Sequence, residues 1–529
     1  MPPSAPLRDF STDAKRLVVL CGYAAIIGVG AGALAKLLLT MIGLFTHVLY
    51  EHDFGVSLMQ PDPRHLGPIA ILIPVLGGIA VGFIARFGTD KIRGHGIPEA
   101  IASILEGNSI IRARVAFWKP LASAITIGSG GPFGAEGPII MTGGAFGSLF
   151  AQYLRLSSFE RRTLLVSGAA AGMSATFGSP IAAVLIAVEL LLFEWRPRSF
   201  IPVAVASFVA LGMRLALIAQ APPFAQAGVH AAPSFAFIPW ALLIGVAGGV
   251  VSMLMTKLVY WTEDCYARLP VHWMWWPAIG GLVVGVGGWF VPQALGVGYP
   301  TISAMVNGHL VVDAVLSIIV VKIVIWIASL SSGTSGGVLA PLLMIGAALG
   351  TIFAAIVPGH DAAACAIVGM AALMGGTMRA PFMGTIFALE TTHAWGLAPS
   401  VFVGCIAATA FTVAFVPRSI LTEKLARRGL HVAREYSVHP LELIAVRDVM
   451  RPPSVIAGDV PVILVDARVR AAADLMAELN VRALRVVDER GDVAGIIESD
   501  DLLRAWQRGM REERTRRRVR RVRNILTPN

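Results

Sequence analysis

The sequence predicts an all-α polytopic membrane protein with an internal repeat of broken helices, followed by a small C-terminal α/β domain. Three observations predict this class. The 529 residues are 56% hydrophobic and only 14% charged, whereas soluble domains average about 45–50% and about 25%. Apolar blocks recur later in the chain at a nearly constant offset, and from residue 443 the pattern changes to alternating strands and amphipathic helices.

Six apolar runs are near or above the length of about 17–25 residues that spans a bilayer as a helix. They are Leu17–Leu49, Ile69–Ala85, Phe237–Val259, Trp273–Val291, Val311–Leu330 and Val401–Val416. The first run is too long for the core of a signal peptide, so we expect it to be a retained membrane helix. Ile125–Phe150 and Leu164–Leu192 are interrupted by glycine and proline, and we expect shorter, broken helices there.

The net charge of +10 is concentrated near the C-terminus, where ten arginines fall between Arg504 and Arg523. In a membrane protein such a segment is typical of a cytoplasmic extension that touches anionic lipid, and we expect no nucleic-acid partner. Together with Arg8, Lys15 and Arg16, it predicts cytoplasmic termini and insertion in the plasma (inner) membrane. The four cysteines lack metal-ligand spacing, so no metal site is expected.

An internal repeat organises the apolar part. Gly168–Glu189 aligns with Gly369–Glu390 at an offset of 201, and Ser129–Pro138 aligns with Ser332–Pro341 at an offset of 203. Matched segments interrupted by glycine and proline in two halves indicate a transporter whose site lies near the bilayer midplane, between broken helices.

Three glycine-rich breaks are the candidate site: Gly94–Glu99 (GHGIPE), Gly128–Pro138 (GSGGPFGAEGP) and Gly333–Pro341 (GTSGGVLAP). Irregular backbone at membrane depth must be buried in protein or line a cavity. A helix that begins at such a break offers unpaired N–H groups and the positive end of its dipole, which binds an anion without a full positive charge. The alternative is that the breaks are only tight bends at close helix crossings.

These motifs, in this order, resemble the CLC family of chloride channels and chloride/proton exchangers. GAEGP, GGVLAP and the pattern from Arg379 to Glu390 carry the resemblance, together with a C-terminal block similar to a CBS motif. The resemblance implies a homodimer with one anion pathway per subunit and an inverted internal repeat. It divides the chain into an anion-transport domain at 1–430, a linker at 431–442, a cytoplasmic CBS-like motif at 443–504 and an arginine-rich tail at 505–529.

The resemblance also implies the site residues. Glu136 stands at the gating glutamate: its carboxylate would occupy the anion site in place of chloride, and protonation would let a chloride replace it. The implied anion-binding residues are His95, Gly96, Ile97, Gly134, Ala135, Gly137, Val338, Leu339 and Leu421.

Four positions depart from the family pattern. Ala135 replaces an arginine before the gating glutamate, and Leu421 replaces the tyrosine that closes the central site from inside. His95 replaces a serine, where a neutral imidazole would still donate one hydrogen bond. Leu190 replaces the second glutamate that exchangers often use for inner proton transfer, and Glu194 is too far along the helix to take its place.

Four further ionisable residues occupy matched positions in the two halves. Glu189 and Glu390 lie near equivalent helix ends, where we expect them to cap or pair and so keep the repeats in register. Lys119 and Lys322 lie within apolar runs. They would either supply positive potential to the pathway or be paired or snorkelling cations.

In the CBS-like motif, Asp501 stands at the acid that contacts the ribose of a bound nucleotide. Glu498 replaces a hydroxyl residue near the phosphates, and its charge would repel them, so adenine nucleotide is only a weak expectation as a ligand. A single motif cannot form the usual pair, which favours pairing across two subunits.

The sequence therefore predicts transport of chloride or a similar anion, gated by protonation of Glu136. Because Leu190 removes the inner proton group, it favours a passive channel, with an H⁺/Cl⁻ antiporter as the alternative. Fluoride or nitrate transport and a non-transporting CBS-domain sensor are lesser alternatives. No Ser/His/Asp, HExxH or CxxC pattern suggests an enzyme, and no cofactor is expected.

Overall fold

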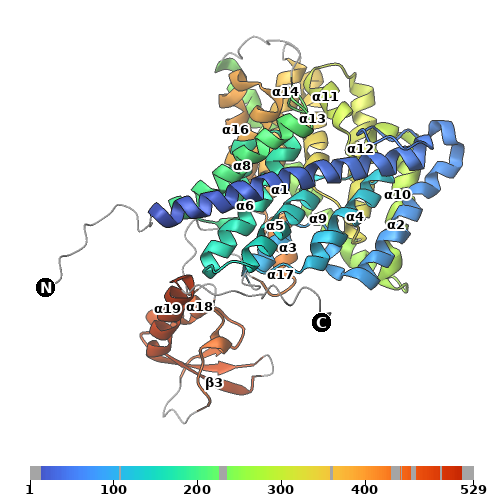
Figure 1. Ribbon diagram of the computed structural model, residues 1–529. Helices are drawn as coiled ribbons and strands as arrows, with labels where there is room; N and C mark the ends of the chain where they lie inside the picture. The colour runs from blue at the N-terminus through green and yellow to red at the C-terminus, as the bar shows by residue number, and fades with distance from the viewer. Residues whose placement is uncertain are drawn as a thin grey trace.

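The computed structural model describes residues 14–105, 109–225, 235–357, 361–430, 441, 444–453, 460–488 and 491–514. Most of them form a body of closely packed helices, and a small domain with a three-stranded sheet follows at the C-terminal end (Figure 1). The predicted linker at 431–442 lies almost entirely outside the described residues.

The helices of the first half run from α1 to α8. Their bounds are α1 Ala14–Thr46, α2 Leu72–Phe83, α3 Ile97–Leu105, α4 Ala113–Gly128, α5 Glu136–Gln152, α6 Ser158–Phe177, α7 Pro180–Ile186 and α8 Pro197–Leu217. The helices of the second half are α9 Ile238–Ala267, α10 Trp276–Phe290, α11 Tyr299–Val306, α12 Val312–Ser331, α13 Leu339–Ile356, α14 Ala362–Met378, α15 Pro381–Thr392 and α16 Ala398–Phe415, and α17 Ile420–Ala426 completes the body.

The internal repeat predicted from the sequence is present in the packing. In the first half α5 packs on α6, α6 packs on α8, and α1 packs on both α6 and α8. In the second half α13 packs on α14, α14 packs on α16, and α9 packs on both α14 and α16. Each half thus repeats one arrangement, with a long tilted helix across two shorter ones.

The two halves meet in opposite directions at α7 and α15. Glu390, near the end of α15, accepts hydrogen bonds from the amides of Ile181 (3.1 Å) and Ala182 (2.9 Å) at the start of α7. Glu189, in the π-helical turn that continues α7, accepts from the amide of Met383 (2.8 Å) at the start of α15. Each helix therefore begins beside the end of the other, which makes the repeat inverted and confirms the capping role expected of the two glutamates.

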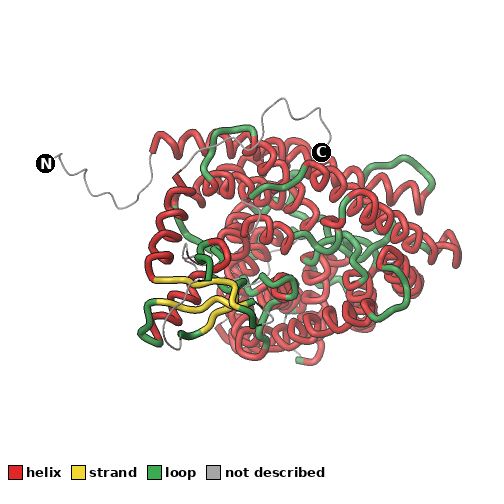
Figure 2. Tube along the Cα trace, turned by 90° about the horizontal axis from the view of Figure 1, so that it is seen from below, coloured by secondary structure: helices red, strands yellow, loops and turns green. Residues whose placement is uncertain are grey.

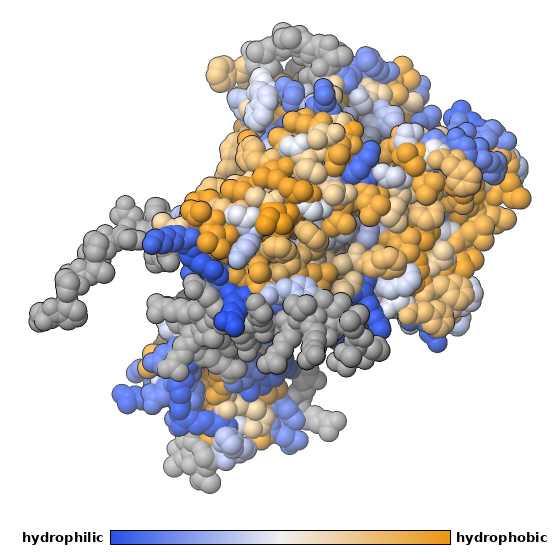
Figure 3. Space-filling model, in the orientation of Figure 1, coloured by the Kyte–Doolittle hydropathy of each residue, from blue (hydrophilic) through white to orange (hydrophobic). Residues whose placement is uncertain are grey.

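Helices of membrane-spanning length carry apolar side chains to the surface of the body. Seven helices in the described residues are long and apolar enough to cross a bilayer: Ala14–Glu51, Arg64–Gly88, Pro197–Leu217, Phe235–Ala267, Val312–Ser331, Leu339–Ile356 and Trp395–Ala426. The visible face of the body is largely hydrophobic, and hydrophilic colour gathers at its ends and on the small domain (Figure 3). Apolar side chains replace polar ones at this surface because lipid, not water, surrounds it.

The sequence missed two of these spans. Pro197–Leu217 contains Arg214, which is buried and donates to the carbonyls of Ala175 and Thr176. Leu339–Ile356 begins within a glycine-rich break, so its N-terminal end reads as a loop. The predicted run at 273–291 forms α10 but is not among the seven.

The C-terminal domain has the α/β pattern predicted for it. Its elements are β1 Val462–Leu464, α18 Val469–Glu478, β2 Ala483–Val487, β3 Val493–Glu498 and α19 Ser499–Arg514. The strands lie together in one sheet (Figure 2). Their order is β1-β2-β3, with β1 parallel and β3 antiparallel to β2. Leu484, Val486 and Ile497 form its buried centre. The boundary predicted after residue 504 falls inside α19, which continues to Arg514.

Removing one interrepeat cap should destabilise the body. Glu390→Ala leaves two amides at the start of α7 without an acceptor, and we expect a loss of about 2 kcal/mol in the free energy of unfolding. Glu390→Gln keeps a neutral acceptor and should lose less. The measurement is thermal unfolding of the purified protein in detergent, with Glu51→Ala, an exposed carboxylate, as the control. Equal melting temperatures for all three variants would contradict the capping role.

Candidate functional site

The three glycine-rich breaks meet in the interior. The amide of Gly94 donates to the carbonyl of Thr334 (3.0 Å), which joins the first break to the third. The amide of Gly337 donates to the carbonyl of Gly134 (3.0 Å), which joins the third to the second. The helices α3, α5 and α13 start directly after these contacts, at Ile97, Glu136 and Leu339. Three segments far apart in the sequence therefore bring three helix N-termini to one place.

Glu136 lies at the start of α5 but its carboxylate binds the start of α13. Oε1 accepts a hydrogen bond from the amide of Ala340 (2.8 Å), and Oε2 has no hydrogen-bond partner among the residues that the structure describes. The side chain is fully buried. A carboxyl oxygen thus accepts a hydrogen bond at the positive end of the α13 dipole.

The residues expected to line the anion site surround this carboxylate. Gly96, Gly134, Gly137 and the flanking residues Ile97, Ala135, Val338 and Leu339 are all buried at the junction of the breaks. The sequence placed the α13 donors at Val338 and Leu339 and missed Ala340, whose amide makes the hydrogen bond. The register of the first helical turn fixes which amide points at the carboxylate, and the sequence pattern does not show that register.

Glycine is required at this junction because the backbones approach so closely. A Cβ atom on Gly137 would lie 2.1 Å from the carbonyl oxygen of His95. A Cβ atom on Gly337 would lie 2.7 Å from Oε1 of Glu136. Both distances are too short for any side chain, so these glycines make room for the neighbouring backbone and for the carboxylate.

Two fully buried lysines hold the breaks together. Nζ of Lys119 donates to the carbonyls of Ile92 (2.7 Å) and Gly94 (2.6 Å) in the segment that binds the third break. Nζ of Lys322 donates to the carbonyls of Ala294 (2.9 Å) and Gly296 (3.0 Å). Neither ammonium group snorkels to the surface, because both are completely enclosed and paired with backbone oxygens.

The second lysine acts on the break that contains Glu136. The amide of Gly296, whose carbonyl holds Lys322, donates to the carbonyl of Gly130 (3.0 Å). Lys119 therefore steadies a segment of the first half that binds the second half, and Lys322 does the reverse. Lys322 thus takes the paired role, one of those that the sequence left open for the two lysines.

His95 lies between the junction and a small pocket. Its carbonyl oxygen packs against Gly137, and its imidazole lines the pocket, with Nδ1 buried and without a hydrogen-bond partner in the described part of the chain. The other lining residues are Val259, Tyr260, Glu263, Leu330, Ser331, Ile420 and Lys424.

Leu421 does not line this pocket, although its neighbour Ile420 does. The Leu421 side chain is fully buried in the apolar core. Tyr260 from α9 donates its hydroxyl to the carbonyl of Ile420, the residue next to Leu421 (2.5 Å). No motif around Tyr260 marks it as a site residue, so only the packing of α9 against α17 reveals it.

A histidine, an aspartate and a serine come into contact at the end of α1 and in the loop that follows it. Nδ1 of His47 contacts Asp53 Oδ1 (2.6 Å), and Nε2 contacts Ser57 Oγ (3.0 Å). The amide of Gly55 and the imidazole of His47 hold the pKa of Asp53 below its usual value by hydrogen bonding. The spacing of these residues matches no hydrolase motif. Their contacts hold together a loop that also contains Gln60. The side-chain amide of Gln60 donates hydrogen bonds to three carbonyls of the 292–295 segment.

Asp501 in the small domain is already engaged. Its carboxylate accepts hydrogen bonds from Arg451 Nε (3.0 Å), Arg504 Nη2 (2.7 Å) and the amide of Glu498 (2.9 Å). The hydrogen bond that Arg451 donates to Asp501 raises the pKa of Arg451 above its usual value. A nucleotide ribose would have to displace these donors. Among the described residues no three His, Cys, Asp or Glu side chains gather as a metal site.

A protein-family model described as voltage gated chloride channel matches residues 76–413, which is more than half of the chain, and a CBS domain model matches residues 446–508. The chain belongs to the voltage-gated chloride channel (CLC) family. Two H⁺/Cl⁻ exchange transporters named ClcA, from Salmonella paratyphi B and Salmonella newport, are each 32% identical to this CLC protein over 362 residues. The alignment covers 65% of this chain and 75% of each relative.

Solved structures share the CLC fold. A slow cyanobacterial Cl⁻/H⁺ antiporter aligns with a TM-score of 0.70 at 20% identity, over 79% of this chain and 99% of the other. A CLC-type fluoride/proton antiporter aligns with a TM-score of 0.64 at 22% identity, over 78% and 98%. A eukaryotic CLC transporter aligns with a TM-score of 0.65 at 18% identity, over 92% and 99%. The expected fold of inverted repeats with broken helices is thereby confirmed.

A side chain that pushes the first and second glycine-rich breaks apart should destabilise the junction where the three breaks meet. Gly137→Ala forces its methyl group against the His95 carbonyl, so we expect a loss of about 2 kcal/mol or more of stability. Gly212→Ala is the matched control, because Gly212 lies in α8 with open space around its Cα atom. Alanine there should be neutral or stabilising. Thermal unfolding in detergent tests both variants, and equal melting temperatures would contradict the close approach.

Proposed function

We propose that this CLC protein exchanges chloride for protons across the membrane, with Glu136 as the residue that binds in the anion site and carries the proton. The observation that carries the proposal is the Glu136 carboxylate at the N-terminus of α13, hydrogen-bonded to the amide of Ala340. An ionised carboxylate and a chloride ion compete for the same donors. A protonated carboxyl group binds these donors less well and leaves them to chloride.

The cycle follows from this competition. Protonation of Glu136 lets its side chain leave the α13 amides, and chloride takes the vacated place. Loss of the proton restores the charge, and the carboxylate displaces the chloride. Protein backbone supplies the positive potential, so the anion is held without a tight ion pair and can leave again. No cofactor takes part in this cycle.

We prefer chloride/proton exchange to the passive chloride channel, which the sequence favoured because Leu190 replaces the inner proton-transfer glutamate. The ClcA relatives, at 32% identity, are named H⁺/Cl⁻ exchange transporters, and this supports the alternative rather than the channel. Glu189 is committed to capping α15, and Glu194 pairs with Arg162 (3.3 Å) and Arg196 (3.4 Å). Neither carboxylate stands in for the replaced glutamate.

The proposal includes a homodimer in the plasma membrane with both termini in the cytoplasm. Arg16, near the start of α1, pairs with Glu160 in the first turn of α6 (2.5 Å), and α19 of the CBS-like domain contacts the same helix. These contacts support placing the start of α1 and the CBS-like domain on one side. A basic segment at each end of the chain agrees with that side being cytoplasmic.

The test uses purified protein in chloride-loaded liposomes, with chloride efflux and external pH recorded together. An outward chloride gradient should drive protons into the vesicles against their own gradient. Glu136→Gln, which keeps the size and cannot ionise, should carry chloride without moving protons and without dependence on pH.

Two results would contradict the proposal. Chloride efflux with no proton movement in the unmodified protein would return it to a passive channel. A Glu136→Gln variant with the unmodified pH profile would remove Glu136 from the mechanism. Parallel vesicles loaded with fluoride or nitrate test the lesser alternatives, and vesicles that release no anion at all would favour the sensor.

A further inference from the structure

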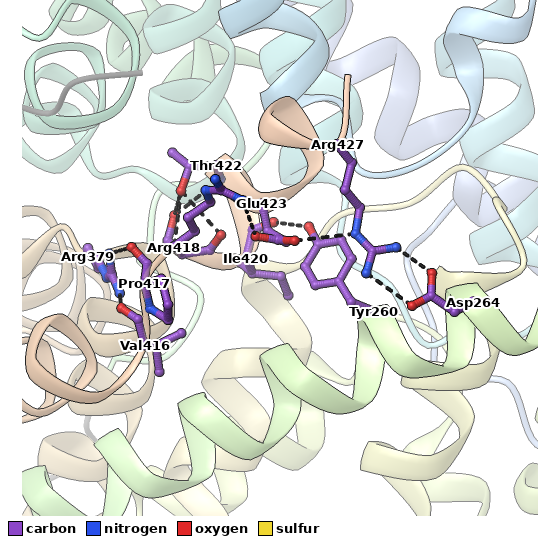
Figure 4. Close-up of polar contacts among 11 residues, drawn as sticks. Tyr260, Asp264, Arg379, Val416, Pro417, Arg418, Ile420, Thr422, Glu423 and Arg427 are labelled. Atoms are coloured by element: carbon purple, nitrogen blue, oxygen red, sulfur yellow. Dashed lines mark hydrogen bonds and ion pairs between the residues drawn. The ribbon is translucent and has the colours of Figure 1, made fainter. Parts of the chain in front are cut away.

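The pocket beside His95 is bounded on one side by α17. This helix is the last described element before the CBS-like domain and begins at Ile420, one of the residues that line the pocket. Ser419 caps it by accepting from the amide of Thr422. Nη1 and Nη2 of Arg379 donate to the carbonyls of Pro417 and Val416, immediately before the cap (Figure 4). These hydrogen bonds therefore hold the first turn of α17 and the residues just before it in place.

Tyr260 fastens the opposite wall of the pocket to this turn. It projects from α9, and its hydroxyl donates to the carbonyl of Ile420 (2.5 Å). Both residues line the pocket and both are buried. The hydrogen bond thus joins two residues that line the pocket, one on α9 and one at the start of α17.

Arg427 holds the ring of Tyr260 in this position. Its guanidinium lies 4.7 Å from the ring centroid, in cation–π geometry. Nη1 and Nη2 bind both carboxylate oxygens of Asp264 at 2.6 and 3.2 Å, and Nε contacts Glu423 at 3.4 Å (Figure 4). Asp264 is one turn beyond Tyr260 on α9, so Arg427 connects the end of α17 back to the helix that carries the tyrosine.

A second set of contacts ties α17 to α3. Glu99, on the helix that follows His95, contacts Lys424 Nζ (3.5 Å) and Arg428 Nη2 (3.1 Å). The amide of Gly96 donates to the same carboxylate (3.1 Å). The turn that closes the pocket is therefore linked to the first glycine-rich break through one buried carboxylate.

We propose that Tyr260 is a gate for this pocket, shut by its hydrogen bond to Ile420 and held by the Arg427–Asp264 pair. The inference rests on the proposed function, since the pocket is taken as part of the anion pathway. It assigns to a residue of α9 the closing role that the family pattern placed at Leu421. Opening requires the Tyr260–Ile420 bond to break, so that the ring or the first turn of α17 swings away.

Accessibility of the pocket tests the gate without reference to transport. Ser331→Cys places a thiol among the lining residues, and an anionic methanethiosulfonate reagent added to purified protein measures how often it is reached. Peptide mass spectrometry reads residue 331 apart from the native cysteines. With Tyr260→Phe added, which keeps the ring and removes the hydroxyl, modification should be about fivefold faster, the change expected from losing one hydrogen bond.

The matched control is Tyr266→Phe. Tyr266 is a buried tyrosine on the same helix that packs against Trp276 and is not among the residues that line the pocket. Its variant should leave the rate at residue 331 unchanged. Asp264→Asn should raise the rate about two- to threefold, since this ion pair is partly exposed, and combining it with Arg427→Gln should add little.

Anion efflux from liposomes gives the second readout. A gate that restricts the pocket should discriminate against large anions, so Tyr260→Phe should raise the ratio of thiocyanate to chloride efflux, and Tyr266→Phe should not. Equal modification rates for Tyr260→Phe and Tyr266→Phe would overturn the gate even if chloride transport is normal. Faster modification in a protein that carries no chloride would keep the gate and overturn the proposed function.

Discussion

The hydrogen bond between the Glu136 carboxylate and the Ala340 amide depends on two halves of the chain meeting at broken helices. A buried carboxylate is costly unless donors satisfy it. Here the donor belongs to a helix start, where amides have no partner within their own helix. Two features of the junction support this contact: glycines allow the close approach, and the hydrogen bond between Gly337 and Gly134 joins the two breaks. In the proposed exchange, these donors are the ones that chloride uses when the side chain leaves.

Each half of the chain makes contacts that the other half needs. These contacts explain how so much irregular backbone stays ordered inside a membrane protein. Glu189 caps a helix of the second half and Glu390 caps one of the first. Lys119 and Lys322 each hold a segment of their own half that in turn binds a break of the other. The two glutamates are thus paired with the other half, and the two lysines with carbonyls of their own half.

The sequence predicted the parts of this account that are carried by backbone chemistry. Clusters of glycine and proline marked the three helix breaks, and the matched spacing of Lys119 with Lys322 and of Glu189 with Glu390 predicted the repeat. The sequence did not predict the hydrogen bond from Ala340 to Glu136 or the one from Tyr260 to Ile420, because these depend on helix register and on which faces of α9 and α17 meet. The His47–Asp53–Ser57 staple was missed for the same reason, since a loop brings the three together without any recognised spacing.

The central claim is that the Glu136 carboxylate occupies an anion site built from the amides of α13. Anomalous diffraction from crystals of Glu136→Gln grown in bromide tests it most directly. The account predicts a bromide ion within hydrogen-bond distance of the Ala340 amide, where the unmodified protein holds Oε1. A glutamine that takes the place of the carboxylate, with no anomalous density at the start of α13, would contradict it.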